Sequence, residues 1–577
     1  YRLTLPWMLA MGMLLLLFGI VYYILFRTFL NITTGNRGAA RIRYREKKMN
    51  ARSVRCALLW KEWKRLTGSV SYMLNCCLGI FMLLIGAVVI LIKGDALMSM
   101  AEMIPGISDA LPLLACLAAC ELVSTTPSDP NDKPSDKDST EVEQPPVEPV
   151  DPSIDMSKTG LEYLYDTSVI PEIHVKVSAE QWAKLLSLYD ANSKTKQYVS
   201  CDITYIKGEE KTDITNAGLR LRGNTSRRRP QDNEGRMHHC HFGLNFRKFV
   251  KDSDHEIHGA RKANLKWFKD DAAYVRELYC YDLFRRDSVW TAPFSTYCRL
   301  WLEVDGKQTY YGVYEMIEPI DTRYLKARKE LFGGDEGNLW KCRWGASLNS
   351  TNANFGLDDG SDAEFTYEMK SDDNDFETAK AQLQDFILKL NGKGDDSFYK
   401  WIQEICDVPL LLRTYAVNVV CGMWDDYWNN CNNYYIYFNT TDRYNYKFFF
   451  IPYDYDNTLG TSSMMDSGRQ DPFNWGNNSN PLIYRILKFA DFREIYREAL
   501  LELVDESSAL FYYTASMERI KGWQNQVKDY VSNDTGEDCV IEDRPASWGN
   551  HGEYRLLENG SNNFFQVKTE TINRYCK

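Results

Sequence analysis

A chain of 577 residues is too long for one hydrophobic core, so the sequence predicts two or more domains. A formal charge of −11 argues against a nucleic-acid-binding protein whose affinity comes from neutralising phosphates. Hydrophobic residues make up 44% of the chain and aromatic residues 13%, which excludes a wholly disordered protein and indicates a globular core.

Residues 1–109 are predicted to be a membrane segment with two transmembrane helices, at about 5–29 and 75–93. Each helix contains an uncharged apolar run that is long enough to cross a bilayer. The loop between them, residues 31–74, carries eleven Lys and Arg but only two Glu. By the positive-inside rule this loop is expected in the cytoplasm, and the chain after the second helix is expected outside.

Residues 1–115 resemble a fragment of an ABC-2-type transporter permease, with "LLWKEWKRLTGSVSYMLNCCLGI" as the closest stretch. This resemblance implies one alternative for the whole chain, a truncated permease subunit. Whether the join to the rest of the chain is a natural fusion or an artefact stays open at this point.

Residues 110–123 contain a third apolar run, "ALPLLACLAAC", which is too short to span a membrane. Its end resembles the lipobox of bacterial lipoproteins, which implies a lipid anchor at Cys120. The alternatives are a re-entrant segment or part of a third span, and a third span would turn the C-terminal domain into the cytoplasm. Residues 124–154 are rich in Pro, Ser and acidic residues and predict a disordered linker.

Residues 155–577 predict a globular α+β domain, because strand patterns come first and helical patterns follow. Strands are expected at 171–177, 200–206 and 218–223, helices at 178–190 and 272–286, and a hairpin over 299–317. From residue 373 the pattern is mainly helical. This order predicts two lobes with a cleft between them.

Ten cysteines lie in this domain and none belongs to a CxxC pair, so a structural zinc site is not expected. Their scattered spacing permits disulfides without establishing any, and most are expected to be buried thiols.

Two stretches dense in Asp and Asn carry the candidate chemistry, "MWDDYWNNCNNYYIYFN" at 423–439 and "FIPYDYDNTLG" at 450–460. Asp425 and Asn430 have the spacing of a protein-kinase catalytic loop, in which the Asp accepts a hydroxyl proton and the Asn helps to hold a metal. Asp454 follows an apolar strand, as does the kinase aspartate that binds Mg²⁺. Asp456 faces the same way as Asp454 only if the strand has already given way to a turn.

These carboxylates predict a site for Mg²⁺ and a nucleotide, because Mg²⁺ prefers carboxylate and phosphate oxygens. A structural Ca²⁺ site or a capping network within the loops is the alternative interpretation.

Four segments together resemble the CotH kinase family over about residues 160–577: "LRLRGNTS", "YYGVYEMIEPID", "DDYWNNCNNYYIY" and "PYDYDNTLG". The resemblance implies a bilobal atypical protein-kinase-like domain, with a β-rich N-terminal lobe and a helical C-terminal lobe. It also implies ATP, Mg²⁺ or Mn²⁺, and phosphate transfer to serine or threonine of a protein substrate.

Carried over by this resemblance, Asp425 is the catalytic aspartate and Asp454 the metal-binding aspartate. Glu318 and Asp321 match the acidic pair after the hairpin, and Arg222 lies in the segment that approaches the nucleotide. Metal ligands are then expected at Asp454, Asn430 and Asp456, and cofactor contacts at Arg222, Lys266 and Glu318.

The chain departs from the family at Asn245, where members often carry Lys or Arg. Arg222, Lys266 and Lys341 are the alternative sources of a charge for the phosphates. "MHHCHF" at 237–242 is not expected to form a metal site, and "SRRRP" at 226–230 is either a surface loop or a contact for an anion. No GxSxG, HExxH or Walker-type loop is present.

The sequence therefore predicts a membrane-tethered atypical protein kinase whose C-terminal domain lies outside the cytoplasm. Its expected partners are a protein substrate and the membrane, and not nucleic acid. Besides the permease subunit, a catalytically inactive surface, adhesion or coat-type binding protein with the same fold is the alternative.

Overall fold

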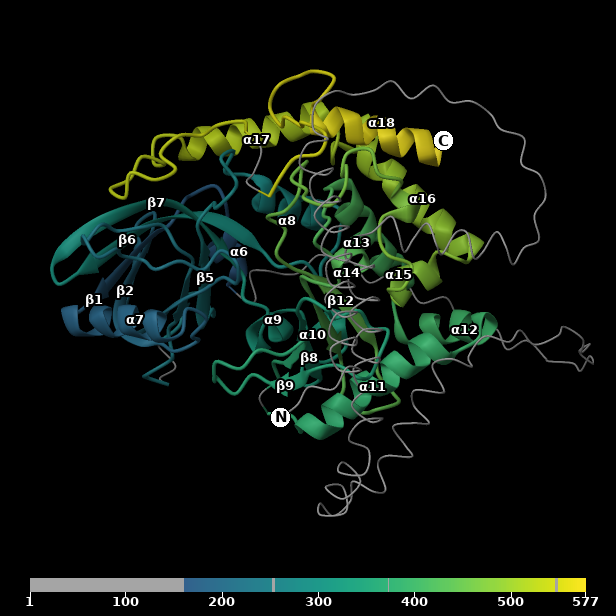
Figure 1. Cartoon of the computed structure of the whole chain (residues 1–577), viewed down its shortest axis with the longest axis horizontal. Coiled ribbons are helices and arrows are strands. Elements are labelled where there is room, and N and C mark those ends of the chain that lie inside the picture. The colour runs from purple at the N-terminus through teal and green to yellow at the C-terminus, as the bar shows by residue number, and fades with distance from the viewer. Residues whose placement is uncertain (1–159, 252–254, 372, 545–547) are drawn as a thin grey trace, which may run out of the picture. The chain divides into compact units, whose positions relative to one another are not determined.

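Seven strands close into a barrel in the computed structural model of the chain, in the order β1-β2-β3-β4-β5-β7-β6 (Figure 1). Their bounds are β1 Glu172–Val177, β2 Val199–Lys207, β3 Glu210–Leu221, β4 Phe242–Asn245, β5 Lys262–Lys266, β6 Ser295–Val304 and β7 Lys307–Ile317. Neighbouring strands are antiparallel except for β1 and β6, whose parallel pairing closes the barrel.

The structure describes residues 160–251, 255–371, 373–544 and 548–577, which belong to one compact unit. The membrane spans, the lipobox-like segment and the linker predicted for the first 154 residues lie outside these ranges. Within them, no helix combines the length and the apolar character needed to cross a bilayer.

The barrel strands form because apolar residues alternate with polar ones along them, so that one face of each strand is buried. In β1, for example, Ile173, Val175 and Val177 are buried in the barrel core, and β2 alternates in the same way. The hairpin between β6 and β7 is confirmed: Asp305 and Gly306 both have positive φ, 51° and 78°, as a two-residue turn of this kind requires.

Helices α7, Ala179–Ala191, and α8, Arg276–Arg286, both contact strands of the barrel. Helix α7 is capped by Ser178, whose hydroxyl accepts from the N–H of Gln181, and it packs against β2. Helix α8 begins four residues later than the pattern from 272 predicts. The carboxylate of Asp271 accepts from the N–H groups of Val275 and Arg276, and these bonds hold the intervening residues in turns.

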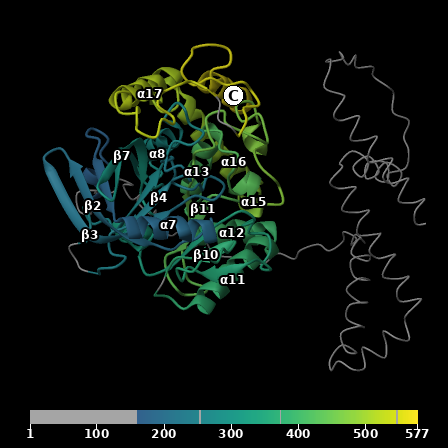
Figure 2. The ribbon, with the colours of Figure 1, turned by 60° about the vertical axis from the view of Figure 1, so that its left-hand side comes forward.

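A second sheet lies in the helical part of the chain, with strand order β12-β11-β8-β10-β9. Its strands are β8 Asn338–Cys342, β9 Phe355–Leu357, β10 Tyr367–Met369, β11 Tyr434–Phe438 and β12 Phe448–Pro452. The other helices of the described residues are α6 Leu161–Tyr165, α9 Thr322–Ala327, α10 Lys329–Phe332, α11 Phe376–Gly392, α12 Asp395–Ile405, α13 Val408–Val420, α14 Tyr427–Asn430, α15 Pro481–Ile486, α16 Ala490–Val504, α17 Tyr513–Val527 and α18 Phe564–Cys576. Short 3₁₀ turns lie at Pro472–Asn474 and Glu506–Ser508. Figure 2 shows the barrel strands on one side of this unit and α11, α12, α15 and α16 on the other. The mixed α+β architecture predicted from the sequence is therefore confirmed.

Helices cover both faces of the second sheet. On one face, Phe386 of α11 stacks on Phe448 of β12 with ring centroids 4.5 Å apart. On the other face, Phe332 of α10 packs against Tyr437 and Phe449. Lys341 of β8 pairs in register with Tyr435, so its side chain lies on the face that α9 and α10 cover in part.

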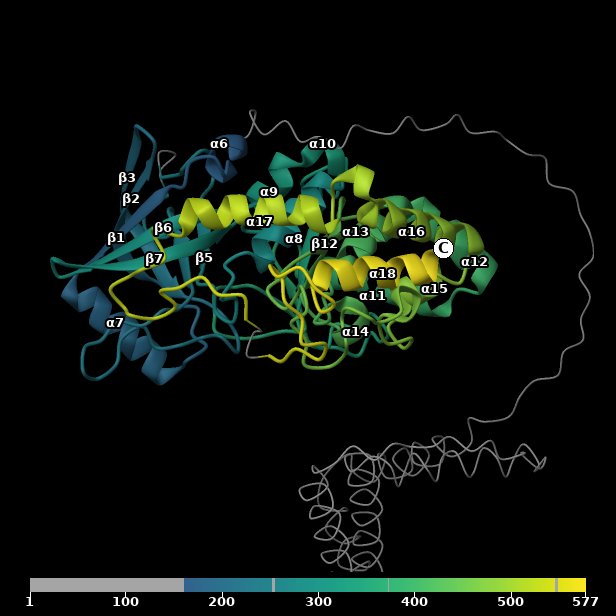
Figure 3. The ribbon, with the colours of Figure 1, turned by 90° about the horizontal axis from the view of Figure 1, so that it is seen from above.

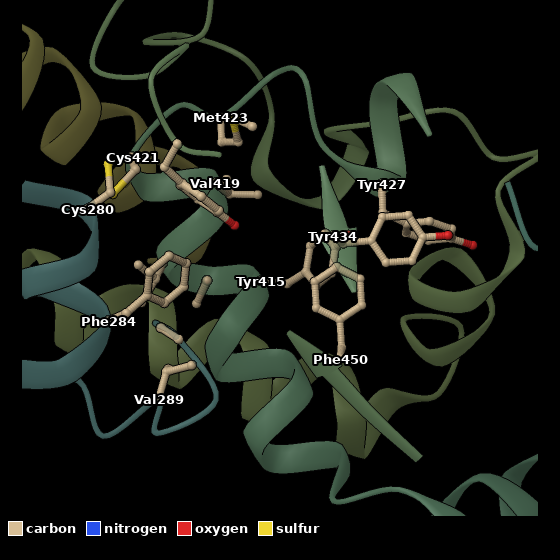
Figure 4. Close-up of a cluster of buried hydrophobic side chains, with 14 of the residues drawn as sticks. Cys280, Phe284, Val289, Tyr415, Val419, Cys421, Met423, Tyr427, Tyr434 and Phe450 are labelled. Carbon is tan, nitrogen blue, oxygen red and sulfur yellow. The ribbon is translucent and has the colours of Figure 1, made fainter. Parts of the chain in front are cut away.

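Helix α13 connects this sheet to α8 through the cluster in Figure 4. Tyr415 of α13 contacts Phe450 of β12, and Phe450 stacks on Tyr434 of β11 at 5.0 Å and 7°. Cys280 and Phe284 of α8 belong to the same buried core. This packing sets the position of α8 relative to the ends of β11 and β12.

The C-terminal segment joins the helical part to the barrel, and Figure 3 shows α17 reaching toward β5, β6 and β7. The hydroxyl of Tyr310 on β7 donates to the carbonyl of Tyr530, and the indole N–H of Trp267, next to β5, donates to Asp538. The relative placement of barrel and helices therefore rests on contacts far apart in sequence.

Candidate functional site

Lys266, the last residue of β5, lies at the centre of a group of carboxylates. Its Nζ donates to Asp454 Oδ1 at 2.6 Å and to Asp456 Oδ2 at 3.3 Å, and it also donates to Glu277. Burial by itself lowers the pKa of this ammonium, but the three carboxylates outweigh that effect and raise the pKa well above its usual value. Lys266 is therefore a permanently charged residue that joins the barrel to the helical part.

Glu277, in the first turn of α8, is a residue of the candidate site that sequence reasoning missed. It is 3% exposed, and burial raises the pKa of its carboxyl although Lys266 opposes the shift. Its Oε1 accepts from the N–H of Tyr455 and from the hydroxyl of Tyr281, both at 3.1 Å. The sequence offered little to distinguish it, because α8 carries a second buried acid, Asp282.

The turn after β12 brings Asp454 and Asp456 to the same side. The strand ends at Pro452, and Asp454 has φ 64°, in the left-handed region that few non-glycine residues occupy. Both carboxylates reach Lys266, so the turn has already replaced the strand at these residues. Their side chains are 35% and 37% exposed, which leaves carboxylate oxygens open to a ligand.

Asp425 is held by three asparagine side chains. The amide of Asn430 donates to its Oδ1 at 2.6 Å, Asn433 donates to its Oδ2 at 3.0 Å, and Asn432 contacts both oxygens at 3.2 and 3.3 Å. Burial raises the pKa of Asp425, the amides oppose this, and the charge of Asp454 adds to it. The two aspartates are therefore close enough to interact electrostatically.

The neighbouring Asp426 has a different environment. It is 3% exposed, accepts from the N–H of Asn429 at 2.8 Å as the N-cap of α14, and accepts from the Asn418 amide at 2.8 Å. Burial raises the pKa of Asp426 to about 7. Asp426 holds the loop together, whereas Asp425 lies close enough to Asp454 for the charge of that carboxylate to raise its pKa.

A divalent cation fits the residues of this site. Oxygen atoms of Glu277, Asp454 and Asp456 all lie within 4.8 Å of one another. Burial raises the pKa of Asp456 to about 8, and the charges of Asp454 and Glu277 add to the shift that Lys266 opposes. This excess of carboxylate over ammonium is what a hard cation with oxygen ligands would neutralise.

Two further cations from the predicted set lie beside the aspartates. Arg222, which follows β3, donates from Nη2 to the hydroxyl of Tyr453 at 3.1 Å. Nζ of Lys341 lies 4.9 Å from the ring centroid of Tyr453, and its charge helps to lower the pKa of Asp454 below the value that burial alone would give. Asn245, the departure from the family pattern, is the last residue of β4 and faces Lys262 across the sheet.

Glu318 and Asp321 lie elsewhere. Arg328 donates to both oxygens of Glu318, at 2.8 and 2.7 Å, and both side chains are fully or almost fully buried. Asp321 is the N-cap of α9, where it accepts from the N–H of Arg323. Among the described residues no contact joins Glu318 to Lys266, Asp425 or Asp454, so the structure does not bring this predicted cofactor residue to the site.

The remaining polar segments have structural partners. In "MHHCHF", His239 contacts the carbonyl of Tyr311 at 2.9 Å and His241 accepts from the N–H of Trp267 at 3.1 Å. In "SRRRP", Arg228 pairs with Glu537 and Arg229 with Asp190. Burial and the charge of Lys266 lower the pKa of His241 to about 3, so this histidine is neutral.

All ten cysteines of the domain are free thiols, and eight of them are buried, as the sequence predicts.

Comparison with known proteins places the chain in a family. None of the curated proteins compared with it matches. The family model described as CotH kinase protein matches residues 219–562, more than half of the chain, and this segment contains Lys266, Glu277, Asp425 and Asp454. The chain therefore belongs to the CotH kinase protein family.

Proposed function

We propose that the protein is a metal-dependent kinase that transfers phosphate from ATP to serine or threonine of a protein. The observation that carries the proposal is the position of Lys266, whose ammonium pairs with Glu277 of α8 and also meets Asp454. In protein kinases a strand lysine pairs with a helix glutamate, and an aspartate from a turn holds the metal ions beside them. Residues from β5, α8 and the turn after β12 form a similar set of contacts here.

Each residue then has a role in a kinase with a β-rich and a helical lobe. Lys266 orients the phosphates, and Glu277 holds Lys266 in place. Asp454 and Asp456 would hold Mg²⁺ or Mn²⁺, and the side-chain oxygen of Asn430, whose amide nitrogen donates to Asp425, would be a further ligand. When bound, the ion supplies positive charge against the charge that develops on the transferred phosphoryl group.

Asp425 accepts the proton of the acceptor hydroxyl. Its three asparagine donors fix the direction of the carboxylate without adding positive charge, so the group stays an acceptor. The raised pKa of Asp425 brings it closer to the working pH of a general base than a solvated aspartate would be.

The test is transfer of labelled phosphate from ATP by the full chain in detergent with Mn²⁺, to itself or to a generic acidic protein. The wild-type protein should transfer label, and Asp454→Ala should lose both transfer and metal-dependent ATP binding while it unfolds at a similar temperature. Equal transfer by the two proteins would reject the assignment of Asp454. No transfer and no ATP binding by the wild type would indicate a catalytically inactive binding protein.

The membrane tether and the location outside the cytoplasm form a second part of the proposal. They are supported by the apolar runs and the charge of the loop in the first 109 residues, and by the lipobox-like end at Cys120. Protease added to intact cells should remove the kinase domain, and Cys120→Ser should abolish incorporation of labelled fatty acid. Protection of the domain in intact cells would place it in the cytoplasm instead.

A further inference from the structure

Lys341 is a lysine beside the site that pairs with no carboxylate among the residues that the structure describes. Its Nζ lies 4.9 Å from the ring centroid of Tyr453 and 5.7 Å from that of Tyr435. No carboxylate of the residues that the structure describes forms an ion pair with it. A lysine in such a position is costly unless an anion binds there, because its charge is partly removed from water.

The charges around Lys341 make the ammonium still more costly. Burial lowers the pKa of Lys341 well below its usual value, and the nearby charges of Arg343, Lys370 and Arg222 lower it further. The acid that opposes them, Glu368, is 0% exposed and is already bound by Arg343 at 2.8 Å and by Lys370. Asp358 and Glu364 also pair with Lys370 and Arg343, so within the described residues these two cations are offset and Lys341 is not.

Arg222, which follows strand β3 of the barrel, contacts the same tyrosine as Lys341. It donates to the hydroxyl of Tyr453, the residue before Asp454, and it forms no ion pair with a carboxylate in the described ranges. Gly243 on β4 makes this position possible, because a Cβ there would lie only 2.9 Å from Cδ of Arg222. Arg222 and Lys341, from different parts of the fold, thus meet at Tyr453.

Lys266 cannot supply all the positive charge that a triphosphate requires. Its ammonium already contacts three carboxylates. A metal ion held by Asp454 and Asp456 would offset those carboxylates, and the triphosphate would remain to be balanced. The cations that remain are Lys341 and Arg222, and Lys341 is close enough to Asp454 to lower the pKa of that carboxyl.

We infer that Lys341 and Arg222 bind the triphosphate of the nucleotide, opposite the carboxylates that hold the metal. The inference rests on the proposed kinase function and adds the residues that recognise the anionic part of its cosubstrate. The phosphates supply the counter-charge that Lys341 lacks, and the planar guanidinium of Arg222 donates two parallel hydrogen bonds to phosphate oxygens.

The experiment measures ligand affinity calorimetrically with the full chain in detergent. Three ligands are compared in the presence of Mn²⁺: ATP, adenosine and inorganic tripolyphosphate. Lys341→Met and Arg222→Met should each weaken binding of ATP and of tripolyphosphate at least tenfold and leave adenosine affinity unchanged. Lys341→Arg should restore most of the loss. Lys176→Met, which removes an exposed lysine from β1, is the matched control and should bind all three as the wild type does.

A stability measurement accompanies the binding data. Without ligand, Lys341→Met should unfold at a higher temperature than the wild type, because the variant buries no unpaired amine. Its stabilisation by ATP should be smaller than that of the wild type.

Each outcome separates this inference from the proposed function. If the wild type binds ATP and both methionine variants bind it equally well, the inference is overturned and the kinase proposal stands. If the wild type binds tripolyphosphate through Lys341 but transfers no phosphate, the inference stands and the kinase proposal fails. If the variants keep ATP affinity but lose phosphorylation of an acidic protein, the two cations serve the acceptor, and the inference is again overturned.

Discussion

The main-chain N–H of Tyr455 donates to Oε1 of Glu277 at 3.1 Å, so the residue between the two candidate metal-binding aspartates is bonded directly to helix α8. The hydroxyl of Tyr281 reinforces this connection, because it accepts from the N–H of Asp454 at 3.0 Å and donates to the same glutamate oxygen. One carboxylate therefore positions the aspartate turn and Lys266 together. Movement of α8 would displace both.

Glu277→Gln should lower phosphate transfer on the order of a hundredfold, because the amide keeps the volume but loses the ion pair that positions Lys266. Initial rates at saturating ATP and Mn²⁺ test this. Asp282→Asn is the matched control, since it neutralises another buried acid of α8 that pairs with Arg285 and Arg286. Equal loss in both variants would mean that α8 contributes only stability.

Substitution of Asp425 should lower phosphate transfer far more than substitution of its neighbour Asp426. Asp425→Asn should lower kcat by about 10²–10⁴-fold with little change in ATP affinity, as expected for loss of a general base. Asp426→Asn keeps an N-cap of α14 and should retain most of the activity. Single-turnover rates and ATP titrations of both variants measure which aspartate the reaction requires. Retention of transfer by the first variant and loss by the second would exchange the two roles.

The pH dependence of the wild-type rate follows from the same carboxylate. A general base works in its ionised form, so transfer should decrease as the pH falls through the pKa of Asp425. Burial raises this pKa above that of a free aspartate, and the decrease should therefore begin at a higher pH than for a solvated carboxylate. A rate that stays constant well below the usual range of an aspartate would argue against this role.

The functional loops could be predicted from the sequence because their signals are local. Asp425 and Asn430 lie five residues apart in one loop, and Asp454 and Asp456 follow one apolar strand. Each pattern can therefore be recognised without knowledge of the fold. The hairpin at Asp305 and Gly306 was predictable for the same reason, since the turn conformation restricts its own residues.

The partners of these loops depend on tertiary contacts and left no local signal. Glu277 reaches Lys266 and the aspartate turn only because α8 packs beside the turn after β12, through α13 and the cluster of Figure 4. The parallel pairing of β1 with β6 joins segments more than a hundred residues apart. The strands β9 and β10 have three residues each, too few for a periodic pattern to emerge.

Glu318 was predicted as a cofactor residue, and its ion pair with Arg328 gives a direct test of that role. Arg328→Met should destabilise the protein by about 3–5 kcal/mol, because it leaves Glu318 charged, buried and without its partner. The double variant Glu318→Gln, Arg328→Met should recover much of this loss in urea unfolding. If Glu318→Gln alone weakens ATP binding beyond its effect on stability, the residue contacts the cofactor after all.

Lys568 on α18 provides a test of stability far from the proposed chemistry. Its side chain is 0% exposed, and its Nζ lies 4.4 Å from the ring centroid of Trp475 and has no hydrogen-bond partner in the part of the chain that the structure describes. Burial lowers the pKa of this lysine to about 7, against weaker opposing effects from Cys421 and Asp466. Lys568→Met should therefore raise the free energy of unfolding by roughly 2–5 kcal/mol at neutral pH.

The sign of the pH dependence follows from proton linkage. Above about pH 7 the folded protein holds Lys568 uncharged, whereas the unfolded chain keeps it protonated up to about pH 10.5. The unfolded state thus binds more protons in this window, and the wild type should gain stability relative to Lys568→Met as the pH rises through it. Urea unfolding of both proteins at about pH 6.5 and about pH 9, one on each side of the shifted pKa, measures the change. Lys521→Met, at an exposed position of α17, should show no such trend. A constant difference between wild type and Lys568→Met would mean that the buried amine keeps its proton throughout, held by the Trp475 ring and Asp466.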